Sequence, residues 1–309
     1  MCYSAQVWAA YQKFVRVHGA IMDIKEFVRT FIDVKARGQW NRLPKAMRES
    51  FRKPESAEGF ELAKLVAEGD RELEATIEAE LSAQRERLTK AEAVLAGAKP
   101  TKKAADDQRI AGNKIKAAER KLDDLRRREL EPDDSRIYPG YYAPLMVWED
   151  GRRVVKPMRY QCRPVGKPAS YDKDYPGTYN ARRDNLEGFW RGQFGHTHGL
   201  MVVETFYENV EGPDGKNRVV QFTPRDREPM LVACLWSRWE GPGETLLSFA
   251  AITDEPEPEV AAAGHDRTII NIKPEHIDAW LRPDPANLAE LYAIFDDKRH
   301  PYYEHRVAA

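Results

Sequence analysis

The stretch GLMVVETFYENV, residues 199–210, decides the fold of this chain. Apolar, β-branched and aromatic residues dominate it, which predicts a strand. A second run of this type, NRVVQFTP (217–224), follows the turn signal EGPDGKN (211–217), so we expect the two runs to form a hairpin. The runs PMLVACLWSRW (229–239) and TLLSFAAIT (245–253) are expected to continue an antiparallel meander. The second half of the chain, from about Tyr138, is therefore predicted to be β-rich.

The first part of the chain shows helical periodicity instead. Between about Ala5 and Phe51, apolar residues recur at helical spacing and predict two or three packed helices. Near the C-terminus the pattern predicts two short helices, one from Pro274 to Leu281 and one from about Asn287 to Phe295.

Residues 58 to about 131 carry a heptad-like pattern rich in Ala, Glu, Lys, Arg and Leu. The break AGAKPTKKAADD (96–107) separates two arms, so the segment predicts an antiparallel coiled-coil hairpin. Its basic stretch RKLDDLRRREL (120–130) is more typical of a solvated helix face than of a face that contacts DNA. The expected seam residues are Ile77, Leu81, Gln84, Leu88, Ala91 and Leu95 in the first arm and Ile115, Ala118, Leu122 and Leu125 in the second.

Composition limits the classes of function. The chain has 49 Lys and Arg against 50 Asp and Glu, so a role with nucleic acid must rest on local basic patches. No apolar run approaches the roughly 18 residues that cross a bilayer, so no membrane partner is expected. Cys2, Cys162 and Cys234 are an odd set without C-x-x-C spacing, and no signal peptide is recognisable, which favours a reducing, cytoplasmic setting. Cys162 and Cys234 have apolar or aromatic neighbours and are expected to be buried.

Four short stretches carry residues suited to chemistry: MC (1–2), YNARRDNL (179–186), ETFYEN (204–209) and AGHDRTIINI (263–272). Each of the last three places a polar or ionisable residue beside a predicted strand, where the sheet fixes the backbone. Initiator methionine is generally removed before a small residue, so Cys2 could become an N-terminus with an amine and a thiol on one residue. His196 and His198 form an H-x-H pair without further ligands at recognisable spacing, so neither a metal nor a cofactor is expected.

The order and spacing of Cys2, NAR (180–182), FYE (206–208) and HDR (265–267) resemble those of the SRAP family, the SOS response-associated peptidases. Members of that family carry an N-terminal Met-Cys, an Asn-Ala-Arg motif, an aromatic-rich strand that ends in a catalytic Glu, and a His-Asp-Arg motif. The resemblance covers the first few residues and about Tyr138 to Leu281. The sequence departs from the family at Tyr3 and Ser4, where Gly-Arg is usual, and at VET (203–205), where Ala-Asp-Gly is usual.

The resemblance implies recognition and covalent capture of abasic sites in single-stranded DNA, as part of a DNA damage response. Freed of Met1, Cys2 would match the nucleophile that ends as a stable thiazolidine crosslink. Asn180 would match the asparagine that orients the reacting group, Glu208 the acid/base glutamate, and His265 the histidine that assists ring opening and imine formation. In the same way, the resemblance implies that Arg182 and Arg267 hold the phosphates that flank the lesion.

The chemistry of these residue types agrees with the resemblance. An α-amine, with a pKa of about 8, condenses with an aldehyde near neutral pH, and a thiol, with a pKa of about 8.5, is nucleophilic as its thiolate. When both belong to Cys2, attack of sulfur on the imine carbon closes a five-membered ring without a second encounter. A carboxylate and an imidazole, as in Glu208 and His265, suit the proton transfers of these steps.

We therefore expect an α+β fold with a β-rich, SRAP-like core of antiparallel strands. The core would comprise residues 1–10 and 136–309, with a helical insertion at 11–57 and the coiled-coil hairpin at 58–131. Two other functions stay open. The chain could be an N-terminal-nucleophile amide hydrolase or peptidase, which would turn over amides without any aldehyde. Alternatively, it could be a non-catalytic interaction protein that binds a protein partner through the coiled coil, in which case Cys2→Ala would leave the function intact.

Overall fold

The computed structural model describes residues 3–54, 56–212 and 214–308, and it divides into two compact units. Unit 1 comprises Met1–Thr30, Arg42–Ser50 and Glu131–Ala309, and unit 2 comprises Phe31–Asn41 and Phe51–Leu130. Segments 11–30 and 42–50 therefore belong to the same compact unit as the C-terminal half of the chain. The expected division into three domains stays a prediction.

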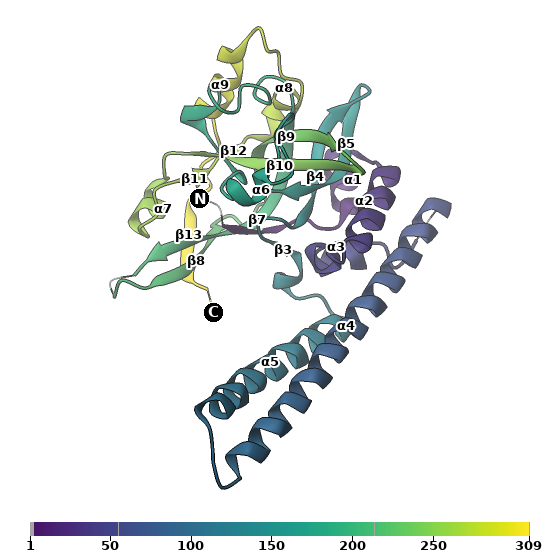
Figure 1. Cartoon of the computed structure of the whole chain (residues 1–309). Coiled ribbons are helices and arrows are strands. Elements are labelled where there is room, and N and C mark those ends of the chain that lie inside the picture. Colours follow the sequence, from purple (N-terminus) through teal and green to yellow (C-terminus); the bar gives the residue numbers. More distant parts are fainter. Residues whose placement is uncertain (1–2, 55, 213, 309) are drawn as a thin grey trace. The chain divides into compact units, whose positions relative to one another are not determined.

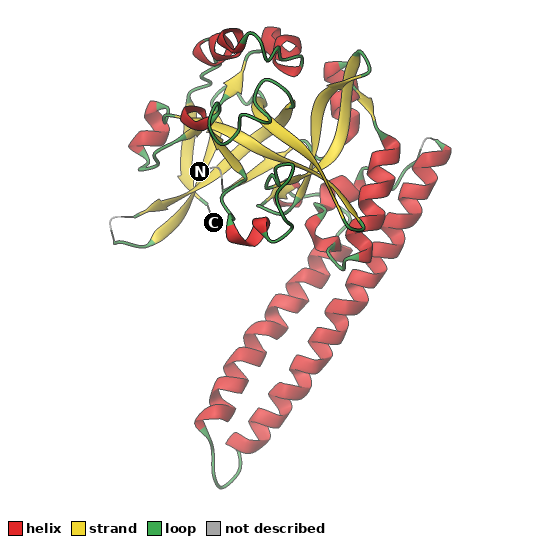
Figure 2. Cartoon of the chain, turned by 45° about the horizontal axis from the view of Figure 1, so that its top comes forward, coloured by secondary structure: helices red, strands yellow, loops and turns green. Residues whose placement is uncertain are grey.

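Unit 1 is built on one sheet, to which 13 strands contribute in the described part of the chain; Figure 2 shows these strands in yellow. The main path has the order β12-β9-β10-β5-β4-β7-β1-β3, and the other strands pair along its sides. Most pairings are antiparallel, as predicted, but β5 and β6 run parallel to β10, and β2 runs parallel to β5. The strands are β1 Ser4–Val7, β2 Ile21–Met22, β3 Arg136–Ile137, β4 Tyr142–Glu149, β5 Arg152–Tyr160, β6 Asn180–Arg182, β7 His198–Glu211, β8 Asn217–Pro224, β9 Met230–Gly241, β10 Glu244–Asp254, β11 Thr268–Ile269, β12 Asn271–Ile272 and β13 Tyr303–Val307.

Strand β7 contains the stretch 199–210 and organises the sheet. Along one edge, β9 pairs with residues 198–203 and β8 with residues 206–211, and β7 has room for both because it is 14 residues long. The β7–β8 hairpin is confirmed. The predicted meander is wrong at its next step, because β9 pairs with β7 rather than with β8, and β8 pairs on its other side with β13. Its last step is confirmed, because β9 and β10 pair antiparallel.

The N-terminal strand β1 lies along the opposite edge of β7, with Ser4 opposite Tyr207 and Ala5 opposite Phe206. The helical periodicity expected from Ala5 onward is therefore wrong for Ser4–Val7, because pairing with β7 and β3 satisfies the backbone groups of that segment. The expected helices follow it as α1 Tyr11–His18, α2 Ile24–Ala36 and α3 Lys45–Glu49. Side chains of β1, β3, β4, β5 and β7–β10 share one hydrophobic cluster on the inner face of the sheet.

Short helices cover the rest of unit 1: α6 Tyr171–Asp174, α7 Pro258–Ala262, α8 Ile277–Leu281 and α9 Leu288–Asp296. The two short helices predicted near the C-terminus are confirmed as α8, which continues a 3₁₀ turn at Pro274–His276, and α9. Trp280 of α8 is fully buried, and its indole N–H donates to the carbonyl of Gly199 at 2.9 Å. The tail is thereby tied to the start of β7.

Unit 2 contains the helices α4 Ala57–Leu95 and α5 Lys102–Arg126, which form the predicted antiparallel hairpin (Figure 1). Ser56 and Thr101 cap the two helices, each accepting a bond from the backbone N–H three residues later. Ile77, Leu81, Ala118 and Leu122 form the buried seam.

Charges across the hairpin also pair. Arg126 contacts Glu74 at 2.6 Å and Glu78 at 2.5 Å, and Arg85 contacts Glu119 at 2.9 Å. At least one arginine of the basic stretch, Arg126, is thus ion-paired within the hairpin. The predicted protein partner of the hairpin stays a prediction. None of the helices that the structure describes combines the length and apolar character needed to span a bilayer.

Gly69 of α4 provides a test of packing in unit 2. A Cβ at this position would overlap the ring of Trp40, which is buried and whose Nε1–H donates to Asp70 at 2.8 Å. We expect Gly69→Ala to destabilise unit 2 by about 1–3 kcal/mol, because overpacking outweighs the gain in helix propensity. Gly112→Ala in α5 is the matched control: it meets open space and should stabilise the hairpin by up to about 1 kcal/mol. Urea unfolding followed by far-UV circular dichroism measures both, and equal effects would contradict the packing.

Candidate active site

Glu208 lies on β7 between two residues of the hydrophobic cluster, Phe206 and Val210. Because side chains alternate along a strand, all three point to the inner face of the sheet. Only 1% of the Glu208 surface is exposed. A carboxyl group in such a place is unusual, because charged groups are rarely buried without a partner or a function.

Two groups from distant parts of the chain contact the Glu208 carboxyl. The backbone N–H of Tyr3, just before β1, is shared between the Tyr207 carbonyl at 3.1 Å and Oε2 of Glu208 at 3.3 Å. Nε2 of His265 lies 3.4 Å from the same oxygen. The β1–β7 register explains the first contact, because it continues from Ser4 opposite Tyr207 to Tyr3 opposite Glu208. Two of the predicted catalytic residues, Glu208 and His265, are thus brought together.

Hydrogen bonds and burial determine where the protons of this pair lie. Burial raises the pKa of the Glu208 carboxyl to about 8, so the group is largely protonated at neutral pH. Burial also lowers the pKa of the His265 imidazole, which favours its neutral form. Nδ1 of His265 lies 2.9 Å from the carbonyl of Arg267 and donates to it, so we assign the neutral ring an unprotonated Nε2. Glu208 and Nε2 of His265 therefore share one proton.

The segment between α7 and β11 holds His265 in place. Gly264 has φ +94°, and a Cβ there would lie 2.9 Å from Cγ1 of Val210 on β7. Glycine is required here for two reasons, the left-handed backbone and the close approach to β7. The N–H of His265 donates to the carbonyl of Val260 at 3.1 Å, which fixes the start of the segment to α7.

Asn180 begins β6, which runs parallel to β10 with Asn180 opposite Ala251 and Arg182 opposite Thr253. Opposite residues of neighbouring strands share a face, and Ala251 belongs to the inner cluster. Asn180 is buried, and neither its amide nitrogen nor its amide oxygen has a hydrogen-bond partner among the described residues. A buried amide without a partner is costly, so this one is available to a ligand.

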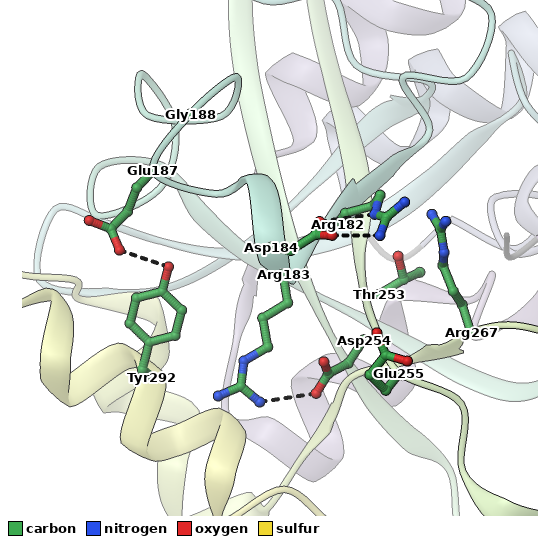
Figure 3. A pocket seen from close by; sticks show the side chains of 10 residues that line it. All are labelled: Arg182, Arg183, Asp184, Glu187, Gly188, Thr253, Asp254, Glu255, Arg267 and Tyr292. Atoms are coloured by element: carbon green, nitrogen blue, oxygen red, sulfur yellow. Dashed lines mark hydrogen bonds and ion pairs between the residues drawn. The ribbon is translucent and has the colours of Figure 1, made fainter.

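The two predicted phosphate-binding arginines line one pocket of about 410 Å³. Figure 3 shows Arg182, Thr253 and Arg267 at one end of this pocket, with Glu187 and Tyr292 at the other. The structure thus brings Arg182 and Arg267 together, although 85 positions separate them in the sequence (267 minus 182).

Acidic residues occupy the same pocket. Arg182 forms a bidentate ion pair with Asp184, at 2.9 Å from Nε and 2.5 Å from Nη2. Arg183 is held by Asp254 and Asp296. The charge of Arg267 is less fully compensated, because the carboxylate that it contacts within the described residues, Asp266, lies at 3.5 Å. An anion entering this pocket would meet Arg267 first and would have to displace Asp184 to reach Arg182.

Thr253 is a site residue that sequence reasoning missed. Only 1% of the Thr253 surface is exposed, and its hydroxyl has no hydrogen-bond partner among the residues the structure describes. Motif order could not identify it, because Thr253 stands at the end of an apolar run and reaches the pocket only through its register with Arg182. The unpartnered hydroxyl was therefore visible only in the folded chain.

Cys2, the predicted nucleophile, lies outside the described residues. Cys162 and Cys234 are buried, as predicted, and neither forms a disulfide within the described residues. Burial raises the pKa of the Cys162 thiol to about 12, which makes it unreactive. Both ring nitrogens of His198 are engaged, Nδ1 by the carbonyl of Trp280 at 3.0 Å and Nε2 by the N–H of Gly195 at 2.9 Å. His198 is thus a structural residue with no lone pair left for a metal.

Comparison with known proteins identifies a protein family whose model matches this chain. The family model described as SOS response associated peptidase (SRAP) matches residues 103–307. A search of curated proteins found no match.

Solved structures also resemble parts of the chain. One is a protein from Bordetella bronchiseptica with 18% identity and a TM-score of 0.47, in which 57% of this chain and 87% of that chain align. A protein from Bacteroides thetaiotaomicron has 14% identity and a TM-score of 0.47, over 57% of this chain and 78% of that one. A phage-related protein from Bordetella bronchiseptica has 19% identity and a TM-score of 0.44, over 56% and 81%.

The raised pKa of Glu208 predicts a pH dependence of stability. Below the ordinary carboxyl pKa of 4.5 the group is protonated in both the folded and the unfolded chain, and above about 8 it is ionised in both. Between these values the unfolded chain releases the proton and the folded chain keeps it, so the free energy of unfolding falls as pH rises. Glu208→Gln has no ionisable group at this position, so its free energy of unfolding does not fall for this reason.

We therefore expect the stability of Glu208→Gln relative to the unmodified chain to increase from pH 4.5 to about 8 and then level off. Urea unfolding of both proteins across this range measures the difference. A constant difference would show that Glu208 titrates normally in the folded chain.

Proposed function

Because a family match over more than half of its length places this chain in the SOS response associated peptidase family, we propose that it captures abasic sites in single-stranded DNA through Cys2. The family description names a peptidase, and we assign that activity the narrow role of exposing Cys2 by loss of Met1. The open-chain aldehyde of the abasic sugar is the proposed substrate.

The proposed reaction has two bond-forming steps. The α-amine of Cys2 adds to the aldehyde carbon, and the carbinolamine loses water to give an imine. The thiolate of Cys2 then adds to the imine carbon, and the nitrogen takes up a proton, which gives a thiazolidine that joins DNA and protein. The net change is the loss of one water molecule, and no oxidant or metal is needed.

Glu208 and His265 supply the proton transfers in this proposal. The protonated Glu208 carboxyl donates to the departing hydroxyl of the carbinolamine, and Nε2 of His265, which is unprotonated in the neutral ring, accepts a proton from the attacking amine or thiol. A pair that shares one proton can act as acid and base in turn without any change in its total charge.

Asn180 and the pocket of Arg182 and Arg267 bind the substrate in the proposal. The unpartnered amide of Asn180 hydrogen-bonds the sugar oxygens, and Arg267, Arg182 and the Thr253 hydroxyl bind the neighbouring phosphate. Asn180 and Thr253 are buried and Arg267 is half-buried, whereas Arg182 is exposed and would have to leave Asp184 to bind a phosphate.

One observation carries the proposal: the backbone nitrogen of Tyr3 donates to the buried Glu208 carboxyl beside His265. Tyr3 N is the atom to which Cys2 is joined in the chain. Pairing of β1 with β7 thus holds the peptide bond that follows the proposed nucleophile beside the buried Glu208 carboxyl and the half-buried His265 imidazole.

Intact-protein mass spectrometry tests the reaction directly. After incubation with a single strand containing one abasic site, we expect loss of Met1 and an adduct with the mass of the DNA minus one water. Cys2→Ala should abolish the adduct, and Glu208→Gln and His265→Ala should slow it by about 10²–10⁴-fold, the usual contribution of a positioned acid or base. His196→Ala is the control and should react normally.

The same assay separates the alternatives. A processed chain that forms no adduct would contradict the proposal. If that chain also hydrolysed amide substrates in a Cys2-dependent way, the N-terminal-nucleophile hydrolase would be favoured instead.

The Arg182–Asp184 pair generates a further prediction. Asp184→Asn removes the carboxylate that competes with phosphate for Arg182, so we expect tighter binding of single-stranded DNA, by about three- to tenfold at low salt. Fluorescence anisotropy measures the change, with Glu240→Gln as the matched control, because Glu240 pairs with Arg238 outside the pocket. Unchanged affinity in Asp184→Asn would show that Arg182 does not contact the DNA backbone.

A further inference from the structure

A line of tyrosine and arginine side chains begins beside Glu208 and continues around the edge of the sheet. We call Tyr3, Tyr138, Arg136 and Tyr207 the rim. The ring of Tyr3 packs edge-on against Tyr138, with centroids 5.8 Å apart. The Arg136 guanidinium carbon lies 5.1 Å from the Tyr138 ring and 3.6 Å from the Tyr207 ring. Aromatic faces thus alternate with a cation.

The rim connects the two faces of the sheet. Ala5 and Phe206 lie opposite each other and belong to the inner cluster, so Ser4 and Tyr207, one position along, face outward. By the same alternation Tyr3 shares the inner face with Glu208. Arg136 lies on the outer face, where Nε and Nη2 donate to Oγ of Ser4 at 3.1 and 3.0 Å. A strand leaving Glu208 across Tyr3 would therefore arrive at Arg136.

Beyond Arg136 the outer face carries a pocket of about 520 Å³, which we call the outer pocket. It is lined by polar side chains of alternate residues on β7 and β8, including Thr205, Gln221 and Thr223, and by Arg227 and Arg306. Two acids, Glu131 and Asp133, also line it. Arg306 donates to the side-chain oxygen of Gln221 at 3.1 Å and forms no ion pair with the described residues, so its charge is available to an anion.

The occupant that fits this arrangement is a single nucleic acid strand. Unpaired bases stack on aromatic faces, and guanidinium groups bind the phosphates between them. Base pairs in a duplex would not offer their faces to the rim. The hairpin offers a poorer surface, because Arg85 and Arg126 are ion-paired with glutamates across it.

We propose that the rim and the outer pocket form the second half of the single-strand site. In this proposal, which rests on the proposed function, a base next to the lesion stacks on Tyr3 and Tyr138, and Arg306 binds the backbone that follows. Arg136, whose side chain is 12% exposed, supports the Tyr138 and Tyr207 rings. The pocket of Arg182 and Arg267 holds the strand on the other side of the lesion. Tyr3 thereby acts twice, through its N–H toward Glu208 and through its ring toward DNA.

Binding of a strand without an abasic site tests this inference separately from the reaction. A short fluorescein-labelled single strand of mixed sequence is titrated with the full chain, and Kd is measured by anisotropy at several salt concentrations. We expect Tyr3→Leu and Tyr138→Leu to raise Kd by about tenfold or more through lost stacking. Arg306→Gln should lower the slope of log K against log salt by about 0.7, the value of one phosphate contact on a single strand.

Matched controls lie outside the rim. Phe60 is an exposed aromatic residue of unit 2, and Arg238 is an exposed arginine paired with Glu240, so Phe60→Leu and Arg238→Gln should leave Kd and slope unchanged. Tyr3 and Arg306 are exposed enough to be replaced without loss of core packing, and the unfolding midpoint of each variant confirms its fold. An unlabelled duplex of the same sequence should compete poorly.

Three results would overturn the inference: wild-type affinity in Tyr3→Leu and Tyr138→Leu, an unchanged salt slope in Arg306→Gln, or equal competition by duplex. The adduct assay decides the proposed function independently. A chain that binds the intact strand through the rim but forms no adduct would refute capture and leave the rim in place.

Discussion

The pairing of β1 with β7 is the constraint on which the site depends. Its register puts Ser4 opposite Tyr207 and therefore brings the N–H of Tyr3 to the Glu208 carboxyl. A shift of one residue would turn Ala5 away from the hydrophobic cluster and Ser4 into it, so core packing enforces the register. The same burial that stabilises the sheet thus fixes the position of Tyr3 relative to Glu208.

Burial of Glu208 also sets the chemistry of the site. The hydrophobic neighbours that hold β7 in the core raise the pKa of the Glu208 carboxyl to about 8. The Arg267 carbonyl binds Nδ1 of His265 and so orients the ring with Nε2 toward the Glu208 carboxyl. Neither group needs a metal to act near neutral pH. Charged side chains line two pockets of unit 1, one with Arg182 and Arg267 and the other with Arg136.

Much of this arrangement could be predicted from the sequence. The hairpin of β7 and β8, the coiled coil and the tail helices follow from local periodicity, and motif order identified Glu208 and His265. Local patterns failed where the decisive partner is distant. Val7 fits a helical pattern but lies in a strand because it pairs with Val203 of β7. In the same way, β9 pairs with β7 although β8 lies between them in the sequence. Asp184 and Thr253 could be identified as candidate site residues only from the folded chain, where they line the same pocket as Arg182.

The central claim is that Glu208 is protonated at neutral pH and shares its proton with His265. Carbon-13 NMR titration of the Glu208 carboxyl, assigned by comparison with Glu208→Gln, tests it most directly. The account predicts a midpoint near pH 8 and a neutral His265 ring with its hydrogen on Nδ1. A midpoint near the ordinary carboxyl value of 4.5 would contradict the account, because an ionised Glu208 could not donate the proton that the chemistry requires.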